Sequence, residues 1–516
     1  MKNKHFPYIN NIILPCVLFS SIAGALTGGV IFAFKLMASR IIDLSATVYD
    51  YVRGHAHMLP YLLLGCVIIG LISALLLSLS KNSRGGGIPT SVAILRGLIS
   101  FHWVNSLILL PISAMLTYLV GVPLGNEGPS VQMGTAVGKG TVKLFSKKHA
   151  AWNRYIMTGG ASAGFATATG APVSGIFFAL EEAHRRFSPM LIMVASTSVI
   201  SGSLVMNALC SHFGISPRLF HFTPFPPLPA KSIWISVVLG IACGCLAGFF
   251  TYLYKKVNVL VTQRLKKVPF AVKMATVFLA TGIVGFAISD CLGSGHSLIE
   301  WIIEGNRSWY ALLLVLAIRL LLLILANNVG VTGGLFIPTL AFGAIIGSIV
   351  SNITVTLGLI PQEYYATVII IAIVSFLSAF VRTPITAIIF SVEALGAYEN
   401  ILPVIIAVII SYIIVEALAI ECFYETVIHA KVKEENRDRE SSVLDDYFTV
   451  QEDSFIVGKE LRDILWPPSC IVLSVERAGS GKSHSDGPIM VGDRLHIHAT
   501  TYNEKRTLFD LKTILG

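Results

Sequence analysis

The chain contains little charge and no cysteine framework. Only 13% of its 516 residues are Asp, Glu, Lys or Arg, whereas 54% are hydrophobic. Soluble domains carry roughly 25% charged residues, so this composition excludes an ordinary soluble protein. The 8 cysteines are scattered, mostly in apolar segments, with neither a disulfide pattern nor metal-ligand spacing. We therefore expect no metal site and no cofactor.

The chain contains many long apolar runs that carry few charged residues. A transmembrane helix needs about 20 apolar residues. Runs near that length recur from Ile12 to about Leu418, and shorter apolar pieces between them are broken by Gly and Pro, as in partial or re-entrant helices. The sequence predicts a polytopic helical membrane protein that is surrounded by lipid. The predicted spans are 12–36, 59–80, 104–122, 189–210, 232–254, 271–290, 309–326, 362–380 and 401–418.

The net charge of +9 does not indicate nucleic-acid binding, because the basic residues gather in short loops between apolar runs. The positive-inside rule places such loops in the cytoplasm and the poorly charged loop 211–231 outside. The basic N-terminus, residues 1–11, lacks a small-residue cleavage site and is predicted to be retained. We expect a multi-pass protein of the cell inner (plasma) membrane with both termini in the cytoplasm. The basic loop residues are Lys143, Lys147, Lys148, Arg185, Arg186, Lys255, Lys256, Arg264, Lys266 and Lys267.

One acid stands alone in an apolar stretch, in the sequence GNEGP at 125–129. Pro129 suits the first turn of a helix, and Gly134 and Gly138 allow another helix to pack closely. A helix that begins inside a membrane leaves free backbone N–H groups and a positive dipole end, which together attract an anion. Glu127 is itself an anion at that place, and we interpret it as a competitor of a transported ion. The alternative is a helix-terminal acid with a purely structural role.

The chain matches itself at three places in order. The segment GNEGPSVQMGTAVG aligns with GLFIPTLAFGAIIG, at an offset of 334 − 125 = 209 residues. Two similar halves with broken helices at matching places are typical of transporters with inverted repeats, in which the breaks meet at the binding site. The matched pairs are 125–138 with 334–347, 85–87 with 293–295, and 171–183 with 383–395; the halves span roughly 12–208 and 232–430.

Three pentapeptides carry a family resemblance. They are GGGIP at 85–89, GNEGP at 125–129 and GLFIP at 334–338. In order and spacing they resemble the GSGIP, GREGP and GxFxP motifs of the CLC family of chloride channels and chloride/proton exchangers, over about residues 10–433. The resemblance implies a homodimer in which each subunit has its own pore.

The resemblance also implies an anion site made of backbone N–H groups and one hydroxyl. The hydroxyl is that of Tyr424, which could instead be an interfacial aromatic residue. Gly86 stands where the family has serine, so one hydroxyl donor worth about 1 kcal/mol is missing. Asn126 replaces the usual basic residue, so chloride is the expected anion but a similar small anion is an alternative. The predicted anion-binding residues are Gly85, Gly86, Asn126, Glu127, Gly128, Leu335, Phe336, Ile337 and Tyr424.

The energetics of the lone acid favour a switch. A carboxylate near mid-membrane costs roughly 2.5–3.5 kcal/mol, and a helix N-terminus returns up to about 2 kcal/mol. Because these terms nearly cancel, protonation can release Glu127 and let an anion enter. The resemblance implies that Glu182 accepts the proton on the cytoplasmic side, although it could merely pair with Arg185 or Arg186. Glu181 has a counterpart in Glu393 and is expected to be structural.

These features predict a secondary active transporter that exchanges chloride, or a similar small anion, for protons. The alternative is a passive gated anion channel of the same fold. An enzyme is not expected, because the apolar segments show no nucleophile–base or metal constellation.

The C-terminal residues have a different character. Residues 431–446 are highly charged and are predicted to be a linker, and 447–516 a small cytoplasmic α+β domain. Strands are expected at 448–450, 470–473 and 494–498, with a short helix at 458–465. The pattern resembles the C-terminal (TrkA-C) lobe of RCK regulatory domains.

Two motifs in this region are not interpreted as sites. The segment GSGKS at 479–483 resembles a phosphate-binding loop, but Glu476 stands where that motif needs glycine. His496 and His498 alternate along one strand and are predicted to lie on a solvated face rather than to bind a metal.

Overall fold

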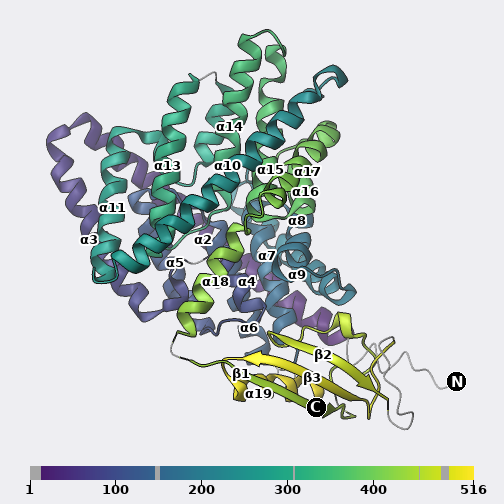
Figure 1. Cartoon of the computed structure of the whole chain (residues 1–516). Coiled ribbons are helices and arrows are strands. Elements are labelled where there is room, and N and C mark those ends of the chain that lie inside the picture. Colours follow the sequence, from purple (N-terminus) through teal and green to yellow (C-terminus); the bar gives the residue numbers. More distant parts are fainter. Residues whose placement is uncertain are drawn as a thin grey trace.

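The computed structural model describes residues 13–516 except 86, 146–150, 223, 306–307, 438, 453 and 478–486. A large helical part stands above a small domain that contains a sheet and the C-terminus (Figure 1). Each part has its own hydrophobic core, since the buried residues of the sheet domain form a cluster separate from the helical one.

The helical part consists of two halves with the same order of elements. Each half begins with two long helices, a short helix and a third long helix. A helix that begins at a glycine break follows. Each half then ends with a long helix, a short helix that begins with Pro, and a final long helix. The first half comprises α2 (Leu14–Gly54), α3 (Leu59–Leu79), α4 (Ile88–Leu95), α5 (Trp103–Val120), α6 (Glu127–Phe145), α7 (Asn153–Thr169), α8 (Pro172–Phe177) with the π-helical turn η5 (Phe178–Ala183), and α9 (Pro189–Phe213).

The second half repeats this order and adds a final helix. It comprises α10 (Trp234–Val259), α11 (Phe270–Ala287), α12 (His296–Glu304), α13 (Trp309–Val329), α14 (Phe336–Thr356), α15 (Tyr365–Val381), α16 (Pro384–Glu393), α17 (Ile401–Ala417) and α18 (Phe423–Glu435). The predicted repeat is therefore visible as a one-to-one pairing of α2–α9 with α10–α17.

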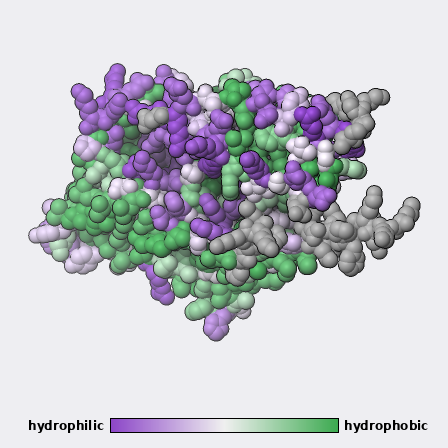
Figure 2. Space-filling model, turned by 90° about the horizontal axis from the view of Figure 1, so that it is seen from below, coloured by the Kyte–Doolittle hydropathy of each residue, from purple (hydrophilic) through white to green (hydrophobic). Residues whose placement is uncertain are grey.

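Ten helices among the described residues are long and apolar enough to cross a membrane. The span prediction missed Phe336–Thr356, because its glycine-rich start was interpreted as part of a broken segment. It also ended the first span at 36, whereas α2 continues to Gly54 through Arg40 and Asp43. Seen from below, hydrophilic residues cover much of the face and hydrophobic residues cover the flank (Figure 2). Exposed apolar side chains along α3, such as Leu64 and Leu75, give that flank a surface suited to lipid.

The two halves cap each other's short helices. The Glu181 carboxylate accepts hydrogen bonds from the backbone N–H groups of Ile385 and Thr386, at 2.9 and 2.7 Å, at the start of α16. The Glu393 carboxylate accepts the equivalent bonds from Val173 and Ser174, at 2.8 and 2.7 Å, at the start of α8. Both also accept a hydroxyl hydrogen bond, from Thr386 and Ser174 respectively. The prediction that Glu181 is structural is confirmed, since its two oxygens satisfy otherwise free helix-terminal donors.

The sheet domain is built from three antiparallel strands in the order β1-β3-β2. The elements are β1 (Ser442–Thr449), β2 (Cys470–Glu476), β3 (Arg494–Thr501) and the terminal helix α19 (Glu504–Leu515). The strands predicted at 470–473 and 494–498 are confirmed within β2 and β3, whereas the one predicted at 448–450 overlaps only the end of β1. Leu495, Ile497 and Ala499 of β3 and Leu511 of α19 are fully buried in its core.

Two predictions for this region are wrong. The linker is shorter than 431–446, because 431–435 complete α18 and 442–446 begin β1, which pairs with β3. The expected helix at 458–465 is reduced to one 3₁₀ turn, Leu461–Asp463. The cause is that Gly458 has a φ of 81°, and its N–H donates to the Ile489 carbonyl across the chain. The GSGKS segment at 479–483 lies outside the described residues.

The two histidines of β3 face a carboxylate on the neighbouring strand. His496 Nε2 and His498 Nδ1 lie 2.5 and 3.4 Å from the Asp445 carboxylate. Their hydrogen bonds lower the pKa of Asp445 below its usual value. Among the described residues, no group of three His, Cys, Asp or Glu side chains is placed to hold a metal ion.

The sheet domain docks on α7 through a buried lysine and three aromatic rings. Lys459 Nζ lies 2.9, 5.3 and 6.0 Å from the ring centroids of Phe455, Trp152 and Tyr155. Burial lowers the pKa of Lys459 to about 6, against the opposing effect of Cys16 and Asp463. Among the described residues Lys459 has no ion pair, and its side chain is held by its contacts with the rings.

Replacing either capping glutamate with alanine should destabilise the junction of the halves. We expect Glu181→Ala and Glu393→Ala each to lower the free energy of unfolding by about 1–2 kcal/mol, the usual effect of losing a helix cap. The measurement is the thermal unfolding midpoint of the purified protein in detergent. The exposed Glu399 serves as the control, and Glu399→Ala should leave the midpoint unchanged. Equal midpoints for all three variants would contradict the capping role.

Candidate functional site

The three glycine breaks meet at one point between the halves. The N–H of Gly125 donates to the carbonyl of Gly334 at 2.8 Å, and the N–H of Gly334 donates to the carbonyl of Gly125 at 2.6 Å. A Cβ atom added to Gly128 would lie 2.7 Å from Gly334 Cα and 2.8 Å from Gly87 Cα. The predicted convergence of GGGIP, GNEGP and GLFIP is thus present in the structure. Only glycines permit backbones to approach this closely.

Small residues also let the helix that begins at Glu127 pack closely on its neighbour. A Cβ atom on Gly134 would lie 2.1 Å from the Gly160 carbonyl oxygen of α7, and one on Gly138 would lie 2.5 Å from that of Ile156. The predicted close helix contact is confirmed, with α7 as the partner of α6.

Glu127 is the first residue of α6 and is fully buried. Its carboxylate lies beside Gly125, where an added Cβ would be 2.5 Å from Oε2. Neither carboxylate oxygen has a hydrogen-bond partner among the described residues. The backbone N–H groups of Glu127 itself and of Ile337, in the other half, face the carboxylate. A buried polar group without a hydrogen-bond partner is uncommon and points to a functional role.

Two polar residues near this acid were missed by sequence reasoning. Lys35 of α2 is within electrostatic reach of Glu127, and its Nζ donates to the Ala168 carbonyl at 3.2 Å. The Tyr118 hydroxyl donates to the Gly125 carbonyl at 2.9 Å and holds the break in place. A cation inside an apolar helix indicates a functional site, so the sequence does contain a signal for Lys35. No sequence pattern distinguishes Tyr118 from other aromatic residues.

A small cavity of about 10 Å³ lies beside the same junction. That volume is close to the space that one water-sized particle occupies. Ile88 and Phe336, from the first turns of α4 and α14, line it together with Glu182 and Tyr424. The Tyr424 hydroxyl is buried and has no hydrogen-bond partner among the described residues. A buried donor without a partner, facing a space of this size, is suited to a small bound ion.

The remaining predicted anion-binding residues lie around the same two helix starts. Leu335, Phe336 and Ile337 are buried at the beginning of α14, where the first backbone N–H groups have no partner within the helix. Asn126 is half-buried, and its carbonyl accepts hydrogen bonds from the N–H and hydroxyl of Ser130. The Gly85 N–H donates to the Gly330 carbonyl at 2.8 Å, so it is already engaged in holding the junction. Gly86 lies outside the described residues.

Glu182 is buried in the π-helical turn η5 and makes no ion pair with the described residues. Arg185 is instead paired with Glu425 at 2.9 Å, and so is Arg96, at 2.7 Å. The Arg186 guanidinium donates to the Ile464 carbonyl. The alternative prediction, in which Glu182 pairs with Arg185 or Arg186, is therefore not what the described residues show.

Arg96 and Glu425 hold this turn and were missed by sequence reasoning. The Arg96 guanidinium donates to the backbone carbonyls of Glu182 and Ala183, at 2.9 and 2.8 Å. Because Arg96 follows α4 and Glu425 lies in α18, no local spacing relates either of them to Glu182.

The sequence profile described as "Voltage gated chloride channel" matches residues 67–416. The chain belongs to the CLC family. This match includes all three glycine motifs and most of both halves, so the resemblance carried by the motifs is confirmed at the level of the family.

Named relatives within the family are exchangers. The chain is 27% identical over 425 residues to the H(+)/Cl(-) exchange transporter ClcA of Salmonella arizonae, covering 80% of this chain and 88% of that one. The same identity and coverage are found with the protein of that name from Salmonella newport.

Solved structures show the same fold. A slow cyanobacterial Cl⁻/H⁺ antiporter aligns with a TM-score of 0.72 and 23% identity, covering 82% of this chain and 99% of the other. A CLC-type fluoride/proton antiporter aligns with a TM-score of 0.66 and 21% identity, covering 78% and 96%. The predicted fold, a polytopic helical membrane protein with a small additional domain, is confirmed.

A single methyl group should force the CLC junction apart. We expect Gly128→Ala to destabilise the protein by about 1–3 kcal/mol, the usual cost of overpacking, because its Cβ would meet backbone atoms of both Gly334 and Gly87. Gly65→Ala in α3 is the matched control, since nothing lies within 4 Å of its added Cβ. Thermal unfolding in detergent compares the two variants, and equal midpoints would show that the breaks do not depend on glycine.

Proposed function

We propose that the protein is a secondary active transporter that exchanges chloride, or a similar small anion, for protons across the cell inner (plasma) membrane. The observation that carries this proposal is the buried, unpaired Glu127 carboxylate at the junction of two helix starts. The names of the family relatives favour exchange over the alternative, a passive gated channel.

The proposed anion site uses main-chain donors. The first N–H groups of α6 and α14 have no partners within their helices, and the two dipoles present their positive ends to the same junction. This arrangement favours an anion through main-chain dipoles, and Lys35 of α2 adds a positive charge within electrostatic reach. The proposed ligands are the backbone N–H groups of Asn126, Glu127, Gly128, Leu335, Phe336 and Ile337 and the hydroxyl of Tyr424, with Gly85 and Gly86 forming the adjacent turn.

Glu127 is proposed to be both gate and proton carrier. As a carboxylate it occupies the positive ends of the helices and excludes the anion. Once protonated it loses that electrostatic attraction, moves away, and leaves its place to the anion. Protons and anions therefore alternate at one position, which couples their movement in opposite directions.

Glu182 is proposed to transfer the proton on the cytoplasmic side. Its support is the burial of an acid that has no ion pair within the described residues and that shares a cavity with Tyr424. Arg96 and Glu425 fix the turn that carries it, and so act as positioning residues.

Further features of the proposal rest on the family resemblance. These are a homodimer with one pore in each subunit, cytoplasmic termini, and a regulatory role for the C-terminal domain as a TrkA-C-like lobe. Exposed apolar side chains on α9 and α17, among them Leu204 and Leu402, offer a surface to a second subunit or to lipid.

Neutralising the gate should separate the two fluxes. We expect Glu127→Gln to retain anion flux and to lose all coupled proton movement, because an amide cannot carry a proton through the cycle. The measurement is chloride efflux and proton uptake by proteoliposomes. The exposed Glu399→Gln is the control and should behave as the unaltered protein. Proton uptake driven by chloride in Glu127→Gln would contradict the gate assignment.

The inner acid should affect only the proton. We expect Glu182→Gln to keep anion flux and to lower the number of protons moved per anion at least about tenfold, since a missing acid–base group costs roughly 10²–10⁴ in proton transfer. The measurement is the ratio of proton flux to anion flux in the same vesicles. An unchanged ratio would assign Glu182 a structural role.

A further inference from the structure

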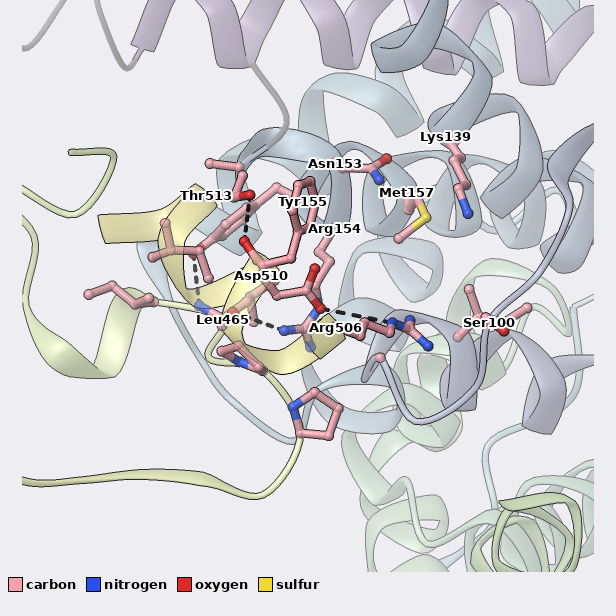
Figure 3. Close-up of a pocket in the computed structure, with 18 of the residues that line it drawn as sticks. Ser100, Lys139, Asn153, Arg154, Tyr155, Met157, Leu465, Arg506, Asp510 and Thr513 are labelled. Carbon is pink, nitrogen blue, oxygen red and sulfur yellow. Dashed lines mark hydrogen bonds and ion pairs between the residues drawn. The ribbon is translucent and has the colours of Figure 1, made fainter. Parts of the chain in front are cut away.

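A cavity of about 160 Å³ lies between the helical part and the C-terminal domain, away from the transport site. Its walls come from both parts: Lys139 of α6 and Arg154 of α7 on one side, and Arg506 and Asp510 of α19 on the other (Figure 3). Neither part encloses the space alone. Small-molecule sites are often found at such domain boundaries.

The charge in this cavity is not balanced. Among the described residues that line it, three are cations and one, Asp510, is an acid. Arg506 reaches Asp510 only at 4.0 Å. Lys139 Nζ donates to the Phe101 carbonyl at 3.0 Å. The Asp510 carboxylate is within electrostatic reach of all three cations, so one negative charge is shared among three positive ones. The cavity thus has an excess of positive charge, which an anionic ligand would balance.

The third cation is fixed by neutral groups as well. Arg154 donates to the backbone carbonyls of Leu95, Leu465 and Trp466, at 3.0, 2.9 and 2.7 Å. These bonds join the end of α4 to the sheet domain and hold the guanidinium in one orientation. Carbonyl oxygens satisfy its donors without neutralising its charge, so its field still acts in the cavity.

Most of the rest of the wall is apolar, and Ser100, Asn153, Tyr155 and Thr513 add uncharged polar groups. Phe101, Met157, Phe455 and Ile514 line the cavity, and the Phe101 ring centroid lies 4.4 Å from Lys139 Nζ. An apolar wall with a few convergent polar groups is the usual composition of a ligand site. The cations would complement an anionic head group, and the apolar wall would complement an apolar body on the same ligand. The volume is below the roughly 300–1,000 Å³ of pockets for drug-sized molecules, which restricts the ligand to a small metabolite.

We propose that this cavity binds a small organic anion, a carboxylate or phosphate monoester with an apolar body, between α6, α7 and α19. The anionic head lies among Lys139, Arg154 and Arg506, and the body lies against Phe101 and Met157. Bound in this way, the ligand ties the C-terminal domain to α6. The same helix begins at Glu127, about 18 Å from Lys139 at 1.5 Å per residue. Occupancy of the cavity therefore regulates transport through α6, a consequence that rests on the proposed function.

Binding of phenyl phosphate to the full-length protein in detergent tests the site without any transport assay. Isothermal titration calorimetry should show saturable binding. Arg506→Gln should weaken it about tenfold or more, the loss expected for a charge-assisted hydrogen bond, and so should Lys139→Met. The matched control is Lys505→Gln on the exposed face of α19, which should bind as the unaltered protein does.

Two further probes define the ligand class. Benzyl alcohol, which has the ring but no charge, and inorganic phosphate, which has the charge but no ring, should each bind at least about tenfold more weakly than phenyl phosphate. Equal binding of benzyl alcohol, equal binding of inorganic phosphate, or no effect of Arg506→Gln would each overturn the proposal. If Lys139→Met does not fold, Arg506→Gln decides, because its side chain is 41% exposed and its removal does not open the core. Failure here leaves the proposed transport function unaffected.

Discussion

The structure depends on the contact of two glycine breaks in the middle of the helical part. Gly125 and Gly334 exchange backbone hydrogen bonds, and this exchange joins the two halves where two helices begin. The polar backbone groups of an interrupted helix are tolerated at membrane depth only where protein or a cavity satisfies them. The junction satisfies some of them and leaves the first N–H groups of α6 and α14 for an ion or for Glu127. Burial, helix direction and the acid's position all follow from this contact.

The reciprocal caps show how the junction is stabilised. The carboxylates of Glu181 and Glu393 each accept hydrogen bonds from backbone N–H groups at the start of a short helix in the opposite half. The two glutamates occupy equivalent positions of the repeat, and so do the helix starts that they cap. The sequence repeat is therefore matched by a repeated contact. The neighbouring Glu182 has no such partner, and its equivalent in the second half is Ala394. The repeat thus separates the acid that holds the fold from the one available for chemistry.

Much of the fold and the position of the site could be predicted from the sequence. The glycine motifs and the repeat predict that GGGIP, GNEGP and GLFIP meet, because the broken helices of inverted repeats come together at the interface between the repeats. Long-range contacts were not predictable: Arg96, Glu425, Lys35 and Tyr118 come from distant elements without a local pattern. Local propensity also failed at 458–465, where pairing with Ile489 and the left-handed Gly458 replaced a helix. The interdomain cavity needed coordinates, since its cations lie on α6, α7 and α19.

The central claim is that one buried acid alternates with an anion and thereby couples two fluxes. Its most direct test is proton movement in proteoliposomes that contain the unaltered protein, with equal pH on both sides, an imposed chloride gradient and the membrane voltage clamped to zero. The account predicts that protons move against the direction of chloride and build up a pH difference. Chloride movement without any pH change would contradict it and would indicate a passive channel.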